Sequence, residues 1–144
     1  MALELLRIYT DGGARGNPGP AGIGAVLYKV HSEDKEELVA EISEYLGPAT
    51  NNQAEYTAVI RALARAAALK AENLELRLDS ELIVKQLRGE YRVKNEDLAK
   101  LFYEVHKLLP KFKNVSIRHV PREKNQAADA LVNLALDRAL KEKS

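Results

Sequence analysis

The distribution of apolar and polar positions along this chain predicts an alternation of strands and helices. Leu5–Thr10 is a short apolar run, which is typical of a buried central strand. The glycines and prolines from Asp11 to Pro20 indicate a turn or loop. Ile23–Val30 and Leu38–Leu46 predict two further strands, joined by an acidic loop around Glu33. The N-terminal third is therefore expected to form a small antiparallel sheet.

The rest of the chain is expected to alternate between helices and strands. The predicted helices span Asn52–Leu69, Ser80–Leu87, Asn95–Leu109 and Gln126–Lys143, and the predicted strands span Leu74–Leu78 and Val115–Val120. Asn52 is the expected N-cap of the first helix, and Glu55, three residues later, has the spacing of a capping box. Because the later strands arrive through helical crossovers, we expect them to pair in parallel.

Composition narrows the class of protein. A chain of 144 residues, 46% hydrophobic and 30% charged, is expected to form one globular domain over residues 1–144. Apolar runs stay well short of the roughly 20 residues that cross a bilayer, and Glu4 and Arg7 interrupt the first one, so neither a membrane span nor a signal peptide is predicted. The sequence has no cysteine, which excludes disulfides and thiolate metal sites and favours the cytoplasm.

The charge distribution is more informative than the net charge of +1. Residues 33–44 are strongly acidic. The balance reverses over residues 85–94, where the basic residues are Lys85, Arg88, Arg92 and Lys94. Such a basic stretch is either a solvated surface or an electrostatic footprint for a phosphate backbone, and the sequence leaves both interpretations open.

Four acidic residues stand at ends of predicted elements: Asp11, Glu55, Asp79 and Asp129. Taken singly, Asp11 fits a turn, Glu55 a capping box and Asp79 the start of a helix. Asp129 is flanked by alanines where the last helix should face inward, and a buried carboxylate there needs a partner such as a shared cation. Together the four predict one metal site.

The ligand set points to hydrolysis of phosphodiesters. Oxygen-only ligands favour Mg²⁺ or Mn²⁺ over zinc. Two such ions roughly 3.5–4 Å apart can activate a water and stabilise a leaving oxygen without a nucleophilic side chain. A dinucleotide-binding site is excluded, because the glycine-rich segment from Gly13 to Gly24 leads from a strand into another strand rather than into a helix.

These residues resemble the type 1 ribonuclease H family, from about Leu5 to Leu140. The motifs that carry the resemblance are Thr10-Asp11-Gly12-Gly13, Asn17-Pro18-Gly19, Ala21-Gly22-Ile23-Gly24, Thr50-Asn51-Asn52 ahead of Glu55, Asp79-Ser80, and Asn125 four residues before Asp129. The resemblance implies a ribonuclease H-like α/β fold, with a five-stranded mixed sheet of three antiparallel and then parallel strands, flanked by helices. It also implies that the first and fourth strands are neighbours, with Asp11 and Asp79 side by side.

The resemblance implies an endoribonuclease that hydrolyses the RNA strand of RNA–DNA hybrids with two Mg²⁺ ions, or Mn²⁺ in their place, leaving 5′-phosphate and 3′-hydroxyl ends. Asp11 would bridge both ions, Glu55 and Asp79 would hold the first, and Asp129 the second. Cleavage of double-stranded RNA, and a non-catalytic nucleic-acid-binding role within a larger polymerase, stay open as alternatives. We expect a monomer.

Substrate contacts are also implied by the resemblance. The positions that match contacts to the minor groove of the hybrid, where the 2′-hydroxyl is sensed, are Asn17, Asn51 and Asn52, and the backbone from Gly13 to Gly16 can approach the substrate closely. Thr50 and Asn95 match the pocket for a phosphate of the DNA strand, but Pro48 replaces the arginine that usually precedes this threonine. Asn17 and Asn52 equally fit a turn former and a helix cap.

The sequence departs from the family pattern at two places. Between residues 88 and 95 it lacks the basic, tryptophan-bearing handle of several members, so Lys85, Arg88 and Arg92 are expected to help bind the hybrid. His119 lies within the end of the predicted fifth strand, at His119-Val120-Pro121, instead of following the strand. We therefore assign the role of the family's active-site histidine to Arg122, with His119 as the alternative.

Overall fold

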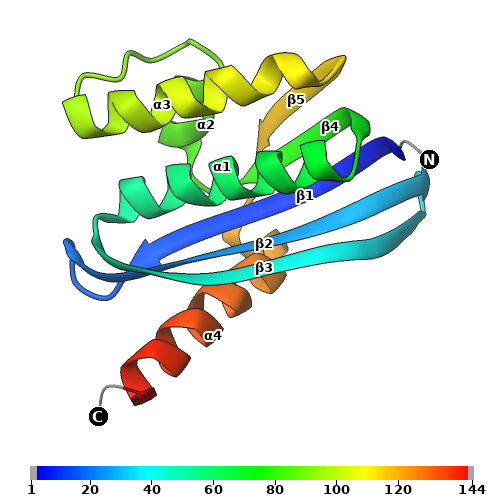
Figure 1. The fold of residues 1–144 in the computed structure, drawn as a ribbon. Coiled ribbons are helices and arrows are strands. Elements are labelled where there is room, and N and C mark those ends of the chain that lie inside the picture. The colour runs from blue at the N-terminus through cyan, green and yellow to red at the C-terminus, as the bar shows by residue number, and fades with distance from the viewer. Residues whose placement is uncertain (1–2, 143–144) are drawn as a thin grey trace.

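A computed structural model describes residues 3–142, and its strands and helices follow the predicted order (Figure 1). The strands are β1 (Leu3–Ala14), β2 (Gly19–Ser32), β3 (Lys35–Ala49), β4 (Ala71–Leu78) and β5 (Asn114–His119). The helices are α1 (Asn51–Ala68), α2 (Glu81–Leu87), α3 (Glu96–Leu108) and α4 (Gln126–Glu142), with 3₁₀ turns η1 (Leu109–Lys111) and η2 (Arg122–Lys124). The predicted end of the last helix at Lys143 lies outside the described residues.

The five strands form one mixed sheet in the order β3-β2-β1-β4-β5. β2 pairs antiparallel with both β1 and β3, whereas β1–β4 and β4–β5 are parallel. This confirms the predicted fold class. In the β1–β4 register Thr10 pairs with Leu78, so Asp11 and Asp79 follow directly at the same edge of the sheet, as predicted.

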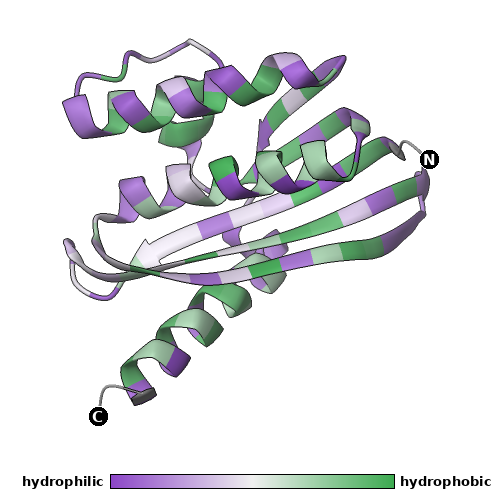
Figure 2. Ribbon diagram, in the orientation of Figure 1, coloured by the Kyte–Doolittle hydropathy of each residue, from purple (hydrophilic) through white to green (hydrophobic). Residues whose placement is uncertain are grey.

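Helices cover the two faces of the sheet unequally. α1, α2 and α3 lie on one face, and α4 lies on the other, mainly against β2 (Figure 1). The core lies under α1, where small side chains such as Ala58 and Ala62 let the helix approach Leu6, Ile8 and Leu76, all fully buried. The helices alternate between hydrophobic and hydrophilic positions (Figure 2), and none of those described is long and apolar enough to cross a membrane.

The predicted loop from Asp11 to Pro20 is mostly strand, so that prediction was wrong. β1 continues to Ala14, because Gly12 pairs with Ile23 and Gly13 with Gly22 across to β2. A Cβ on Gly12 would lie 2.4 Å from the carbonyl carbon of Ala54, so only glycine lets α1 pass this close to the strand. The glycines here serve close packing as well as turning.

The first helix begins one residue earlier than predicted. Its N-cap is Thr50, whose hydroxyl accepts a hydrogen bond from Gln53 N, while Gln53 Oε1 accepts one from Thr50 N. The expected cap at Asn52 and the expected capping-box role of Glu55 are therefore both wrong. Glu55 lies five residues after Thr50, and its carboxylate takes no part in the cap.

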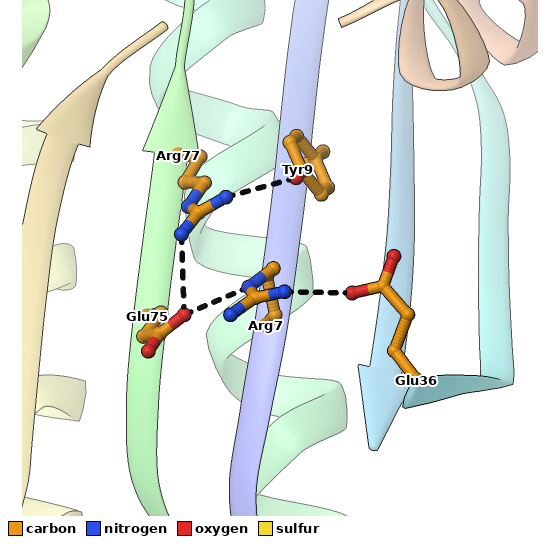
Figure 3. Close-up of polar contacts among 5 residues, drawn as sticks. All are labelled: Arg7, Tyr9, Glu36, Glu75 and Arg77. Atoms are coloured by element: carbon orange, nitrogen blue, oxygen red, sulfur yellow. Dashed lines mark hydrogen bonds and ion pairs between the residues drawn. The ribbon is translucent and has the colours of Figure 1, made fainter. Parts of the chain in front are cut away.

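The part of the sheet that α4 leaves open carries a polar network that joins three strands (Figure 3). Arg7 lies between Glu75 and Glu36, at 2.8 and 2.9 Å. Arg77 donates to the hydroxyl of Tyr9 at 3.0 Å and lies 3.4 Å from Glu75. Both arginines contact the carboxylate of Glu75, and the bonds from Arg7 to Glu75 and from Arg77 to Tyr9 link the side chains of β1 and β4 on this face.

Candidate active site

The four predicted acids meet at the carboxyl-terminal edge of β1 and β4. Asp11 is on β1, Asp79 directly follows β4, Glu55 is in the second turn of α1, and Asp129 is in the first turn of α4. All four line one cleft of about 280 Å³, together with Arg122. Residues separated by more than a hundred positions in sequence are thus brought together by the crossover connections.

Asp129 is exposed, not buried as the sequence pattern predicted. α4 packs on β2 through Ala128, Val132 and Leu136, which are 0, 4 and 2% exposed. Asp129 is the next residue after the buried Ala128, so its side chain points away from the α4–β2 contact and lies at the rim of the cleft. The alanines beside it indicated a packed helix but not which side of the helix is packed.

Burial and mutual repulsion raise the pKa values of two of the carboxyl groups. Burial, the negative charge of Asp79 and a hydrogen bond with Asp129 raise the pKa of Asp11 to about 8. Burial and the charge of Asp79 raise the pKa of Glu55 to about 7, against a hydrogen bond from Ser80 and the charge of Arg122, which lower it. The cleft therefore concentrates negative charge that the protein itself compensates only in part.

Asn125 is a site residue that the sequence predictions did not include. Its side chain is 1% exposed, and its Nδ2 donates to Thr10 O at 2.9 Å and to Asp79 Oδ2 at 3.0 Å. One amide thus ties the start of α4 to β1 and orients the Asp79 carboxylate. Its place in the motif ahead of Asp129 was visible in the sequence, but its partners depend on the sheet register.

The chemistry of the cleft fits divalent cations, although the carboxylates are not arranged as a coordination shell. Glu55 Oε2 is buried without a hydrogen-bond partner, and the ligands are oxygen atoms of the kind that Mg²⁺ and Mn²⁺ prefer. Within residues 3–142, however, no three Asp, Glu or His side chains already form a group that could hold a metal ion. Binding would require these side chains to turn further toward one another.

Arg122 and His119 differ in their relation to the cleft. Arg122 begins η2, three residues after the end of β5, and lines the cleft close enough for its charge to act on Glu55. His119 is the last residue of β5, one residue before the predicted strand end at Val120, and it is exposed and does not line the cleft. The structure therefore places the guanidinium, and not the imidazole, beside the acids.

The residues predicted to contact the minor groove lie around the start of α1. The Asn51 side-chain oxygen accepts from Ala14 N at 2.8 Å, and Asn51 N donates to the Asn17 side chain at 3.1 Å. These bonds join the β1–β2 turn to α1. Gly13 and Asn51 line the cleft, whereas Asn17 is exposed beside it and Asn52 is half-buried in α1.

Both residues predicted for a phosphate pocket are helix caps. Thr50 caps α1, and the Asn95 side-chain oxygen accepts from Leu98 N at the start of α3. A capping threonine keeps its O–H donor, and a capping asparagine keeps its NH₂ donors, so capping is compatible with an anion contact.

Lys85 and Arg88, which were predicted to help bind the hybrid, are paired with acids. Lys85 lies 3.0 Å from Glu81 and above the ring of Tyr91, and Arg88 lies 2.9 Å from Glu90. Neither residue lines the cleft that holds the four acids. The positive charge that Lys85 and Arg88 offer to a phosphate backbone is therefore smaller than the sequence suggested.

The chain is similar to known proteins over nearly its whole length. A family model described as reverse transcriptase-like matches residues 9–135. Ribonuclease HI of Halobacterium salinarum is 47% identical over 91% of this chain, and the crystal structure of RNase H1 from that organism superposes with a TM-score of 0.87, covering 93% of this chain and 98% of the other. LC11-RNase H1, isolated from compost and solved in complex with an RNA/DNA hybrid, is 46% identical over 94% of this chain and 99% of its own, with a TM-score of 0.86.

Some relatives are considerably longer. Bifunctional protein Rv2228c of Mycobacterium tuberculosis is 42% identical over 92% of this chain, but the match spans only 35% of the mycobacterial protein. The match to the halobacterial ribonuclease HI spans 64% of that protein. The similarity therefore concerns one shared unit, and across that unit both sequence and fold agree. This chain belongs to the ribonuclease H family.

Proposed function

We propose that this protein is an endoribonuclease that hydrolyses the RNA strand of RNA–DNA hybrids and leaves 5′-phosphate and 3′-hydroxyl ends. The observation that carries the proposal is the convergence of Asp11, Glu55, Asp79 and Asp129 in one cleft of about 280 Å³. The 46% identity to a ribonuclease H1 solved with an RNA/DNA hybrid supports the choice of substrate. In this proposal residues 1–144 act as a single domain and a monomer in the cytoplasm.

Asp11, Glu55, Asp79 and Asp129 are the proposed ligands of two divalent cations, Mg²⁺ or Mn²⁺. Ribonucleases H generally use divalent metal ions. Such ions supply the activation of the attacking water and the stabilisation of the leaving oxygen. Their charge would also offset the repulsion that raises the pKa values of Asp11 and Glu55.

The remaining residues of the cleft position the substrate and stabilise charge. Arg122 would donate to a phosphate oxygen as negative charge develops there. Asn125 would hold the Asp79 carboxylate in one orientation from behind the cleft. Gly13 offers backbone that the nucleic acid can approach closely, and the amides of Asn17 and Asn51 match the donor and acceptor character of the 2′-hydroxyl.

One incubation series tests this proposal. A labelled RNA–DNA hybrid, an RNA duplex, a DNA duplex and single-stranded RNA are each incubated with the protein, with Mg²⁺, with Mn²⁺ or with EDTA. We expect cation-dependent cleavage of the RNA strand in the hybrid and none of the DNA duplex. Faster cleavage of the RNA duplex would reassign the substrate, and binding of the hybrid without cleavage would indicate a non-catalytic module.

A further inference from the structure

We propose that Arg15 and Asn133 are positioning residues that couple the β1–β2 turn to Asp129. This inference rests on the proposed function, because it assigns Asp129 to the cation site. Arg15 is the first residue after β1, and Asn133 is one helical turn beyond Asp129 on α4. Both line the same cleft as the four acids.

The turn that carries Arg15 has a restricted backbone. Arg15 N donates to Pro20 O at 2.8 Å, and a Cβ on Gly19 would lie 2.2 Å from Arg15 O. Gly16 has a φ of +89°, which favours glycine. The backbone from which the Arg15 side chain extends is therefore well fixed, and the guanidinium reaches α4 from a defined starting point.

On α4 the Arg15 guanidinium has two partners. Its Nη2 lies 2.6 Å from Asp137 Oδ1 and 3.5 Å from Asn133 Oδ1. Asn133 Nδ2 in turn donates to Asp129 O at 3.2 Å and lies 3.5 Å from Asp129 Oδ2. The side chains thus form a continuous path from the β1–β2 turn to one of the four acids.

The direction of this path follows from the donors and acceptors available. A guanidinium has only donors, so it can pair only with the oxygen of the Asn133 amide. With that oxygen turned toward Arg15, the NH₂ group of Asn133 must face the backbone and carboxylate of Asp129. Arg15 and the oxygens of Asp129 thus favour the same orientation of the Asn133 amide, and Arg15 holds that amide against Asp129 while Asp137 holds Arg15 in place.

The Arg15–Asp137 ion pair is too exposed to contribute much to the stability of the folded protein. The Arg15 and Asp137 side chains are 41% and 67% exposed, and pairs this exposed contribute about 0–1 kcal/mol. Arg61 and Glu44 form a pair of similar exposure, 47% and 40%, outside the cleft. Outer partners of metal ligands, by contrast, typically change metal affinity about 10- to 100-fold. The two pairs should thus differ in cation binding and not in stability.

A double-mutant cycle on cation affinity tests the coupling without relying on turnover. Titration calorimetry with Mn²⁺ compares the parent, Arg15→Ala, Asn133→Ala and the double variant, with Arg61→Ala as the matched control. We expect each single variant to bind the Asp129-dependent cation about 10-fold more weakly, and the double variant to be no weaker than Asn133→Ala. Arg15→Lys, which keeps a donor without an acceptor, should recover part of the loss.

Each outcome has a defined meaning. Additive losses in the double variant would show that Arg15 does not act through Asn133, as would affinities equal to that of Arg61→Ala. Loss of hybrid affinity with unchanged Mn²⁺ affinity would instead make Arg15 a direct nucleic-acid contact and overturn the coupling. If the parent shows no Mn²⁺ binding that Asp129→Asn removes, the cation site of the proposed function fails, and this inference fails with it.

Discussion

At the scale of single residues, the site is defined by carboxyl groups whose charged form is unfavourable in the folded protein. Asp11 and Glu55 are partly buried carboxyl groups with raised pKa values, and Glu55 Oε2 has no hydrogen-bond partner. A buried charge without compensation destabilises the folded state. Such residues persist where the compensation comes from a ligand, and this is the physical case for cations in the cleft.

Asp11→Asn should remove nearly all cleavage and stabilise the protein in EDTA. The pKa of Asp11 is about 8 in the folded protein against 3.8 ordinarily, so between these values the folded state binds more protons than the unfolded state. The stability of the parent therefore falls as pH rises from about 4 to about 8, and the asparagine variant escapes this loss. We expect a gain of about 1–2 kcal/mol at pH 8 and none near pH 4, after allowing for solvent screening.

Urea unfolding at several pH values, beside turnover on a hybrid, measures both effects. Asp34→Asn, in the exposed β2–β3 turn, is the control for removing one negative charge. Turnover within tenfold of the parent, or a stability gain that is the same at all pH values, would contradict the assignment of Asp11.

Arg122→Ala should lower kcat by about 10- to 100-fold and change KM little, because its contact would form mainly as charge develops on the phosphate. His119→Ala should affect stability more than turnover, since His119 lies outside the cleft at the end of β5. The pH–rate profile of His119→Ala should superimpose on that of the parent, because the imidazole lies outside the cleft. A folded His119→Ala protein without turnover, beside a fully active Arg122→Ala, would reverse the two roles.

At the scale of elements, α4 reaches the cleft because β2 carries glycine where the helix crosses it. A Cβ on Gly24 would lie 2.2 Å from Ala128 O and 2.9 Å from Leu131 Cβ. The distance from β2 to α4 therefore sets the position of Asp129, which follows Ala128 directly. Packing of the helix and construction of the site depend on the same contact.

Gly24→Ala should displace α4 and lower both stability and turnover. Overpacking of this kind costs about 1–3 kcal/mol, and a shift of about 1 Å in a catalytic group can cost about 100-fold in rate. Urea unfolding and kcat on a hybrid measure the two effects. Gly13→Ala is the control for stability, because its Cβ would meet only Asn51 Oδ1, at 3.9 Å. Parent-like turnover in a folded Gly24→Ala protein would show that α4 tolerates the displacement.

The order and type of the elements could be predicted from the sequence, but several contacts that complete them could not. Strand runs and helix starts are local signals, and they gave the correct order and type of element from β1 to α4, although the N-cap of α1 was wrong. Asn125 and the exposure of Asp129 depend on which side of α4 faces β2, and alanine-rich helices leave that side undefined. The end of β1 was misjudged because glycines, which usually mark turns, here allow α1 to pack closely.

At the scale of the whole molecule, charge is distributed unevenly along the sheet. The acidic β2–β3 hairpin turn lies beside the start of β1 (Figure 1). The cleft lies toward the other end of that strand, where residues 11–14 line it. A phosphate backbone that approaches the cleft therefore stays away from the acidic residues of that turn, Glu33 and Asp34. With a net charge of +1 the protein offers no general attraction for nucleic acid, so binding must depend on local basic residues.

Replacing Lys85, Arg88 and Arg92 together by alanine should raise KM for the hybrid and flatten its salt dependence. For every phosphate that the protein no longer neutralises, the slope of log K against log salt falls in magnitude by about 0.9. Because Lys85 and Arg88 are already paired with Glu81 and Glu90, we expect a decrease nearer to that for one phosphate than for three.

Hybrid binding by Asp11→Asn, which should not cleave, measures the slope between about 50 and 200 mM salt. Replacing the paired Lys107 and Lys113 in the same background is the control. An unchanged slope in the triple variant would show that the basic stretch is only a solvated surface.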